Sequence, residues 1–481
     1  MVFHSMRTTI TAVLRLSVLG LCELCLLGSF LSTPLAAQPI TPGGLEFVPG
    51  STFSMPNPQS IAPGDFDNDG DNDIAIASTA QSKIVILWNG GEGVFFPPVE
   101  IAHPGPFFLE THDLNLDGYL DIICANAFSN SISIFFGTGS GFWPAQNHAV
   151  GTSPYAIVAA DFNEDGIPDL AVANHQSNNV SLLRGDGFGG FEDTWGTFNY
   201  VLPTDLAVAD FNLDGHLDIA TTTSDDSNFS VRYGNGMGAF PVIQNYNMGI
   251  DDALFSVSAE DVTGDGRVDL IFPCPNFDQV IVYRALPAGG FLPMAPILTG
   301  DEPKETMIND FDLDGSLDVG VLNYGSGNMS LSLNDGSGNF SMVQNFESGP
   351  NPVSLRSVDL DGDDQEDLIV ASQNLGTVSI LLNRTLPGGL FLRGDADQDT
   401  MLTIGDPIRV LDAVFGQNPE PLLCPDAGDA DDDGLLTIGD PLFLLTHLFL
   451  SGPAPAAPYS CGVDPTNDDA LAPCPIDPVC L

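Results

Sequence analysis

One acidic phrase recurs seven times along this chain of 481 residues, at intervals of 48 to 51 residues. Its first copy reads Asp-Phe-Asp-Asn-Asp-Gly-Asp-Asn-Asp, from Asp65 to Asp73. We number the seven acidic loops by their first residues, which are Asp65, Asp113, Asp161, Asp210, Asp261, Asp310 and Asp359. Self-similarity at a fixed period of this length is the signature of a repeat architecture. The chain is therefore expected to fold as a series of equivalent units.

Each unit contains four short strand-like segments. In the third unit an apolar run at 156–160 enters the acidic loop and a second run at 170–174 leaves it. A third run at 180–183 follows a polar turn, and a Gly-rich turn ending in Phe191 precedes a fourth, less regular strand. Short apolar runs separated by Gly, Asn and Pro favour sheet over helix. The pattern predicts an all-β fold, a seven-bladed β-propeller spanning 38–392.

The ends of the repeat region fit together. The seventh unit stops after its third strand, at 378–382, while a spare strand-like segment at 45–48 precedes the first loop. We predict that this N-terminal segment supplies the outermost strand of the last blade. Such pairing would close the ring without leaving an open sheet edge.

The acidic loops have the pattern of a cation site. Oxygen-bearing side chains stand at loop positions 1, 3, 5 and 9, and Gly usually stands at position 6. This is the first part of an EF-hand-type loop, in which alternate side chains converge on one hard cation and position 7 adds its carbonyl oxygen. A donor set of oxygens without Cys or His favours Ca²⁺. The alternative is an acidic turn without metal, but carboxylates crowded into one turn repel each other unless a cation is present.

We therefore predict about seven Ca²⁺ ions in the propeller. The predicted ligands are Asp65, Asp67, Asp69, Asp73, Asp113, Asn115, Asp117, Asp121, Asp161, Asn163, Asp165, Asp169, Asp210, Asn212, Asp214, Asp218, Asp261, Thr263, Asp265, Asp269, Asp310, Asp312, Asp314, Asp318, Asp359, Asp361, Asp363 and Asp367. Asn or Thr at position 3 of loops 2 to 5 lowers the ligand charge and is expected to weaken those sites. Asp364 replaces Gly at position 6 of loop 7, where a left-handed backbone is harder to adopt.

The acidic loops, together with the turn Asn-Asp-Gly-Ser-Gly-Asn-Phe at 334–340, resemble FG-GAP/VCBS repeats. Such repeats build the calcium-bearing propellers of integrin α-subunits and of secreted bacterial proteins. The resemblance covers 44–392 and implies a calcium-binding propeller. It implies no single activity, because the fold hosts lectins, adhesion modules and some polysaccharide lyases.

Two further acidic loops, at a different spacing, occupy 393–452. Each places oxygens at positions 1, 3, 5, 9 and 12 of a calcium frame, and each is followed by an Asp-Pro helix start. The pair resembles a dockerin, a small α-helical calcium module, which implies about two more Ca²⁺ ions and a cohesin-like partner. Its ligands would be Asp395, Asp397, Asp399, Thr403, Asp406, Asp429, Asp431, Asp433, Thr437 and Asp440. Ile-Gly replaces the polar pair with which dockerins of cellulose-degrading complexes bind cohesin, and an acidic tail with two amphipathic helices is the alternative.

The chain ends indicate export. Residues 1–37 have the basic start, apolar stretch and small-residue end of a secretory signal, with a buried first helix or a membrane anchor as alternatives. Cys124 and Cys274 are expected to be buried free thiols. Four cysteines, Cys424, Cys461, Cys474 and Cys480, lie in the last 60 residues, where one or two disulfides are expected in an oxidising compartment. Four cysteines allow three disulfide pairings, and a Pro/Asp-rich tail spans 453–481. We expect a secreted, extracellular or cell-surface protein.

Charge and side-chain inventory limit the function. With 64 Asp+Glu against 12 Lys+Arg, the net charge of -52 excludes nucleic acid and anionic membrane surfaces as partners. The seven His residues are scattered and form no catalytic or zinc pattern, so no catalytic residue is predicted. We favour a calcium-binding module for binding, adhesion or scaffolding, whose partner is a carbohydrate or a protein. The alternative is an extracellular polysaccharide hydrolase or lyase. Candidate contacts opposite the acidic loops are Tyr155, Tyr200, Phe255 and Asn374.

Overall fold

The computed structural model describes residues 45–385, apart from 92, 225–227 and 251, together with 390–391, 445 and 459–460. The predicted signal segment, 1–37, lies outside the described residues. Except for three positions, so do the dockerin-like segment 393–452 and the tail 453–481. No helix in the described part is long and apolar enough to cross a membrane.

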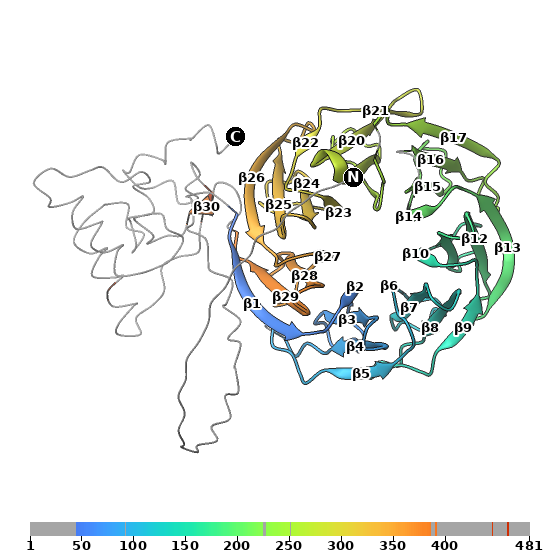
Figure 1. Cartoon of the computed structure of the whole chain (residues 1–481), viewed down its shortest axis with the longest axis horizontal. Coiled ribbons are helices and arrows are strands. Elements are labelled where there is room, and N and C mark those ends of the chain that lie inside the picture. Colours follow the sequence, from blue (N-terminus) through green and yellow to red (C-terminus); the bar gives the residue numbers. More distant parts are fainter. Residues whose placement is uncertain are drawn as a thin grey trace, which may run out of the picture. The chain divides into compact units, whose positions relative to one another are not determined.

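Seven antiparallel sheets follow one another around a ring (Figure 1). Each sheet, or blade, begins with an inner strand and ends with an outer one. Blade 1 contains β2 (Pro58–Gly64), β3 (Asp73–Ser78), β4 (Lys83–Leu87) and β5 (Val99–Ala102); blade 2 contains β6 (Phe108–His112), β7 (Asp121–Asn126), β8 (Ser131–Phe135) and β9 (Gln146–Ala149); blade 3 contains β10 (Pro154–Ala160), β11 (Asp169–Asn174), β12 (Asn179–Gly185) and β13 (Phe191–Asn199).

The remaining blades repeat this order. Blade 4 contains β14 (Pro203–Ala209), β15 (Asp218–Thr223), β16 (Asn228–Tyr233) and β17 (Val242–Asn247); blade 5 contains β18 (Ser258–Glu260), β19 (Asp269–Cys274), β20 (Gln279–Ala285), β21 (Phe291–Pro293) and the short β22 (Ile297–Leu298); blade 6 contains β23 (Pro303–Asn309), β24 (Asp318–Asn323), β25 (Asn328–Asn334) and β26 (Phe340–Glu347); blade 7 contains β27 (Pro352–Val358), β28 (Asp367–Ser372), β29 (Thr377–Asn383) and β1 (Phe47–Ser54). A 3-10 turn, η1 (Pro275–Phe277), links β19 to β20, and β30 (Leu390–Phe391) pairs with β31 (Tyr459–Ser460). The prediction of a seven-bladed, all-β propeller is confirmed for the described residues.

The N-terminal strand closes the ring. β1 pairs antiparallel with β29, from Phe47 opposite Asn383 to Ser54 opposite Thr377. The inner strand of blade 7, β27, also contacts β2 of blade 1, so the inner strands form an unbroken circuit. The predicted closure is confirmed, although the strand begins and ends later than the segment 45–48 on which the prediction rested.

The core lies between neighbouring blades. The second strand of every blade is buried at all six positions. Between blades 1 and 2, for example, Ile84 and Ile86 pack with Ile122 and Phe135. A strand covered on both faces reads as a continuous apolar run, because neither face meets water. Cys124 and Cys274 are buried free thiols within this core, as predicted.

Phenylalanines connect the acidic loops to the next blade. Phe66, at position 2 of loop 1, meets Phe142 of the Gly-rich turn in blade 2 edge to face, with ring centroids 5.4 Å apart. Phe162 of loop 3 meets Phe240 of blade 4 in the same edge-to-face geometry, with ring centroids 5.6 Å apart. Edge-to-face pairs contribute about 0.5–1.5 kcal/mol beyond their buried area. Loop geometry is thereby coupled to the packing between blades.

Removing the apolar contact at the seam should destabilise the ring. Phe47 is 7% exposed, and its ring lies 5.2 Å from Phe346 and 6.2 Å from Phe311 in blade 6. We expect Phe47→Ala to lower the free energy of unfolding by about 3–5 kcal/mol, measured by chemical denaturation. Thr52→Ala, at an exposed position of the same strand, should leave the free energy of unfolding nearly unchanged.

Deletion of 39–55 should lower the melting temperature sharply, because it removes the outermost strand of blade 7. An unchanged melting temperature would contradict the closure of the ring by β1.

Candidate metal sites

The seven acidic loops occupy equivalent places. Each connects the inner strand of a blade to the second strand, as loop 1 connects β2 to β3. Because the strands are antiparallel and every blade has the same order, all seven loops lie at the same face of the ring. The turns between second and third strands, and the links between blades, lie at the opposite face. The two faces of the propeller therefore differ in chemistry.

Position 1 organises each loop by accepting backbone hydrogen bonds. In loop 1, Asp65 Oδ1 accepts from the N–H of Asp69 at 3.2 Å and Oδ2 accepts from the N–H of Gly70 at 3.0 Å. Loops 2 to 6 contain the same two bonds. This arrangement folds the turn back on itself and gathers the side chains of positions 1, 3 and 5.

Two left-handed residues shape every loop. Position 6 has φ between +65° and +99°, with Gly in six loops and Asp364 (φ +65°) in loop 7. Position 4 is also left-handed, although it is Gly only in loops 5 and 7. Leu116, Leu213 and Leu313 adopt φ near +60° there, a conformation that costs an L-residue roughly 1–2 kcal/mol. Sequence reasoning found position 6 through its glycines and missed position 4, which no residue type marks.

The aspartate at position 9 is buried and joins the acidic loop to the chain that follows the third strand; we call it the latch aspartate. Asp73 is fully buried; its Oδ1 accepts from the N–H of Asn89 after the third strand at 2.7 Å, and its Oδ2 accepts from the N–H of Phe66 at 3.1 Å. Six further aspartates make equivalent bonds, with the Oδ2 bond shifted to position 3 in loop 5; they are Asp121, Asp169, Asp218, Asp269, Asp318 and Asp367. Each carboxylate oxygen keeps a second lone pair. Position 9 can thus hold the blade together and still face a cation.

Three loops bring carboxylate oxygens from positions 1, 3 and 9 within 4.8 Å of one another. These clusters are Asp65/Asp67/Asp73, Asp310/Asp312/Asp318 and Asp359/Asp361/Asp367, and each could hold a metal ion. They are the loops with Asp at position 3. In loops 2 and 4, by contrast, the side-chain amides of Asn115 and Asn212 donate to the position-5 carboxylate at 3.0 Å, which relieves repulsion without a cation.

Loops 1 and 6 carry uncompensated charge. Asp67 Oδ1 is buried without a hydrogen-bond partner. Burial, with the nearby charges of Asp69 and Asp65, raises the pKa of Asp67. Burial and the carboxylates of Asp314 and Asp310 raise the pKa of Asp312 to about 6. An orphaned buried oxygen among hard donors fits a divalent cation of the Ca²⁺ class.

The predicted contact residues fall into two groups. Three of them lie at the face opposite the acidic loops: Tyr155 at the start of β10, Phe255 in the link between β17 and β18, and Asn374 in the turn between β28 and β29. The Tyr155 ring stacks on His175 at 4.4 Å, and Phe255 lies 5.6 Å from Lys304 Nζ. Tyr200 is 7% exposed within the core between blades 3 and 4 and receives a hydrogen bond from Arg232 Nε at 3.0 Å. Because Tyr200 is buried, it is not available as a surface contact for a partner, contrary to the prediction.

The inner strands also carry a charged cluster that sequence reasoning missed. On β27 and β23, Arg356 Nη1 donates to Glu305 Oε1 at 2.5 Å. Burial raises the pKa of Glu110 on β6 to about 7, although the charge of Arg356 opposes this shift. Burial likewise raises the pKa of Asp205 on β14 to about 6. These residues are far apart in the sequence, so only the closed ring brings them together.

A second feature missed by sequence is a cavity of about 460 Å³ between blades 1 and 2. Trp88, Phe142 and Trp143 line it, with His103 and Ser140 as polar groups. The Trp143 side chain is 63% exposed. Two of the three tryptophans of the chain thus meet at one place.

The latch aspartates predict a pH dependence. Burial raises the pKa of Asp218 to about 7, above the ordinary value of 3.8, so the fold favours the neutral acid. This contribution to stability is full below about pH 4 and is lost as the pH rises through about 7. We expect the melting temperature of metal-free protein to fall from pH 4 to pH 8, and Asp218→Asn to fall less. Asp301→Asn, an exposed control with the same charge change, should follow the wild type; a flat wild-type profile would contradict the prediction.

Comparisons with known proteins identify the repeat. An FG-GAP-like repeat model matches residues 113–172, 161–221, 210–272 and 310–370, and an FG-GAP repeat model matches 57–87. No curated protein matches the chain.

Comparison with solved structures finds several similar chains. A chain in the crystal structure of BBS1N in complex with ARL6DN is 14% identical, with a TM-score of 0.51 over 71% of this chain and 98% of that chain. A putative 6-phosphogluconolactonase from Bacteroides fragilis is 16% identical, with a TM-score of 0.49 over 63% and 87%. An Agrocybe aegerita lectin that recognises non-reducing terminal N-acetylglucosamine is 20% identical, with a TM-score of 0.44 over 61% and 81%. At 14% identity, the similarity to the chain in the BBS1N complex concerns the fold alone. The repeat matches and the strand order together identify the chain as a seven-bladed β-propeller that contains FG-GAP repeats.

Proposed function

We propose that this chain is a secreted, calcium-stabilised binding module whose propeller presents one face to an extracellular protein or carbohydrate. The observation that carries the proposal is the repeated convergence of carboxylate oxygens at one face, in loops 1 and 6 above all. Asp65, Asp67 and Asp73 would hold Ca²⁺ in loop 1. The bound ion would neutralise the crowded carboxylates and fix the loop against the neighbouring blade.

The opposite face supplies the contacts for a partner. Tyr155 lies between the rings of His175 and Phe107, at 4.4 and 4.9 Å. Lys304 Nζ lies 3.4 Å from the ring centroid of Tyr324. Exposed apolar side chains occupy turns at the same face, among them Phe128, Phe277 and Leu375. Rings held rigidly at a surface are effective contacts for both proteins and sugars, because little side-chain entropy is lost on binding.

The segment 393–452 extends the proposal. Its two dockerin-like loops would bind two further ions and attach the propeller to a cohesin-like or cell-surface partner, while the signal segment would direct export. A polysaccharide hydrolase or lyase is the competing function.

Calcium should stabilise the fold strongly. Each site filled at about 100 times its Kd adds about 2.7 kcal/mol to the free energy of unfolding. We expect the melting temperature to rise with added Ca²⁺ and fall with EDTA, and dialysed protein to retain several ions per chain. Asp312→Asn should reduce the rise, whereas Asp301→Asn should not. No shift in melting temperature and no bound metal would contradict the proposal.

Ligand binding should depend on the face opposite the metal loops. A glycan array, a polysaccharide panel and an extracellular protein library would supply the probes. We expect Tyr155→Ala to weaken any binding found. Phe188→Ala is the matched control, since Phe188 is 91% exposed in the turn between β12 and β13 on the metal-loop side. Release of reducing ends or unsaturated products from a polysaccharide would favour the enzymatic function instead.

A further inference from the structure

Loop 7 differs from the other acidic loops in its internal bonding. Asp359 Oδ1 accepts from the N–H groups of Asp361 and Gly362, at 3.2 and 2.8 Å. In loops 1 to 6 the corresponding oxygen accepts from position 5. The residue left-handed at position 6 is Asp364, not Gly. The backbone at position 6 of loop 7 is therefore left-handed as in the other loops, but Asp359 Oδ1 accepts from positions 3 and 4 instead of position 5.

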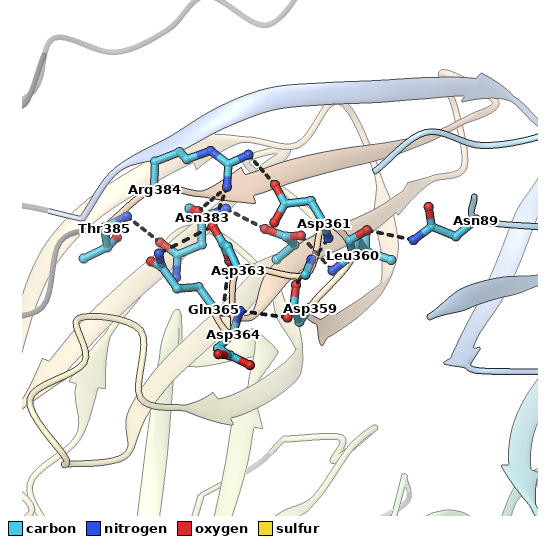
Figure 2. Close-up of polar contacts among 12 residues, drawn as sticks. Asn89, Asp359, Leu360, Asp361, Asp363, Asp364, Gln365, Asn383, Arg384 and Thr385 are labelled. Carbon is cyan, nitrogen blue, oxygen red and sulfur yellow. Dashed lines mark hydrogen bonds and ion pairs between the residues drawn. The ribbon is translucent and has the colours of Figure 1, made fainter. Parts of the chain in front are cut away.

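A guanidinium group occupies the open side of this loop (Figure 2). Arg384 Nη1 donates to Asp363 Oδ2 at 2.6 Å, and Arg384 Nη2 donates to Asp361 Oδ2. Asp363 and Asp361 are positions 5 and 3 of the loop. The guanidinium thus engages carboxylates from which a divalent cation in the same loop would draw its ligands. Asp361 Oδ1 is buried without a hydrogen-bond partner, beside that positive charge.

No other repeat provides a cation at this place. Arg384 directly follows Asn383, whose N–H donates to the latch Asp367 at 2.8 Å. Residues that directly follow the equivalent latch donors in repeats 1 to 6 are Gly90, Thr138, Asp186, Asn235, Leu286 and Asp335. Among the described residues, one other arginine pairs with a predicted loop ligand: Arg184 contacts Asp165 at 3.3 Å. That arginine reaches a single carboxylate, whereas Arg384 bridges two.

Arg384 also lies at the seam where the ring closes. Its backbone N–H donates to the carbonyl of Glu46 at 2.7 Å, and Thr385 Oγ1 accepts from the N–H of Glu46 at 3.0 Å. On the other side, Asn89 Nδ2 of blade 1 donates to the carbonyl of Leu360 at 2.7 Å (Figure 2). Loop 7 is therefore bonded to the first blade and, through Arg384, to Glu46, the residue before β1.

We propose that Arg384 takes the place of a divalent cation in loop 7, so that this loop binds no metal ion and the seam closes without one. A second cation beside the guanidinium would meet like charge at short range and would have to displace two charge-assisted hydrogen bonds. The inference rests on the proposed calcium binding of the other loops. The hydrogen bonds of Arg384 to Asp361 and Asp363 would hold loop 7 at the seam whether or not Ca²⁺ is present.

Metal counting on the full chain tests this inference. Protein equilibrated with Ca²⁺ would be dialysed and analysed for bound metal by elemental and native mass spectrometry. We expect Arg384→Met to bind one more ion than the wild type, because loop 7 becomes available. Arg384→Lys, which keeps a cation, and Arg184→Met should bind the wild-type number.

A matched pair of position-3 variants gives an independent readout. Asp361→Asn in loop 7 should leave the number of bound ions unchanged. Asp312→Asn in loop 6 should lower the number of bound ions or the affinity of the tightest-binding sites. In metal-free buffer, Arg384→Met should lower the melting temperature more than Arg184→Met does. If wild type and Arg384→Met bind the same number of ions and Asp361→Asn binds one fewer, this inference alone would be overturned. No bound metal in any chain would overturn both it and the proposed function.

Discussion

A buried aspartate with two backbone hydrogen bonds holds each blade of this propeller in register. In every repeat its carboxylate joins the acidic loop to the chain that leaves the third strand, as Asp73 joins Phe66 to Asn89. The two bonds hold a carboxylate inside the protein beside the loop, and each of its oxygens keeps a second lone pair. The loop gathers more carboxylates around that charge, so the same interaction that fixes the blade creates the need for a positive partner.

The chain meets this need in three ways. Loops 1 and 6 present three clustered carboxylates. No side-chain amide or guanidinium donates to these carboxylates in the described structure, so these loops are the best candidates for Ca²⁺. Loops 2 and 4 place an asparagine amide against the position-5 carboxylate, which lowers the charge to be neutralised. Loop 7 receives the guanidinium of Arg384. Calcium dependence is thus expected to differ around a ring whose backbone is nearly the same throughout.

Much of the fold could be predicted because its signals are local and repeated. The period is seen by comparing the seven copies. The apolar second strand can be read within a single repeat, as can the glycine at position 6 of loops 1 to 6. Even the pairing of β1 with β29 followed from a missing strand at one end and a spare strand at the other. The acidic loops stand out for the same reason: seven copies of one pattern show which oxygen-bearing positions they share.

The features that sequence missed depend on contacts between distant residues. Leu213 adopts a left-handed backbone because position 6 and the latch determine the turn, not because leucine favours it. Tyr200, chosen as a surface contact, is buried because Arg232 and the neighbouring blade cover it. The pairing of Arg384 with loop 7 and the charged cluster around Arg356 arise only when the ring is closed.

The most direct test of the central claim is an anomalous difference map from crystals grown with Ca²⁺. The account predicts peaks enclosed by Asp65, Asp67 and Asp73 in loop 1 and by Asp310, Asp312 and Asp318 in loop 6. Ordered loops 1 and 6 without such peaks, their carboxylates bonded only to water, would contradict it.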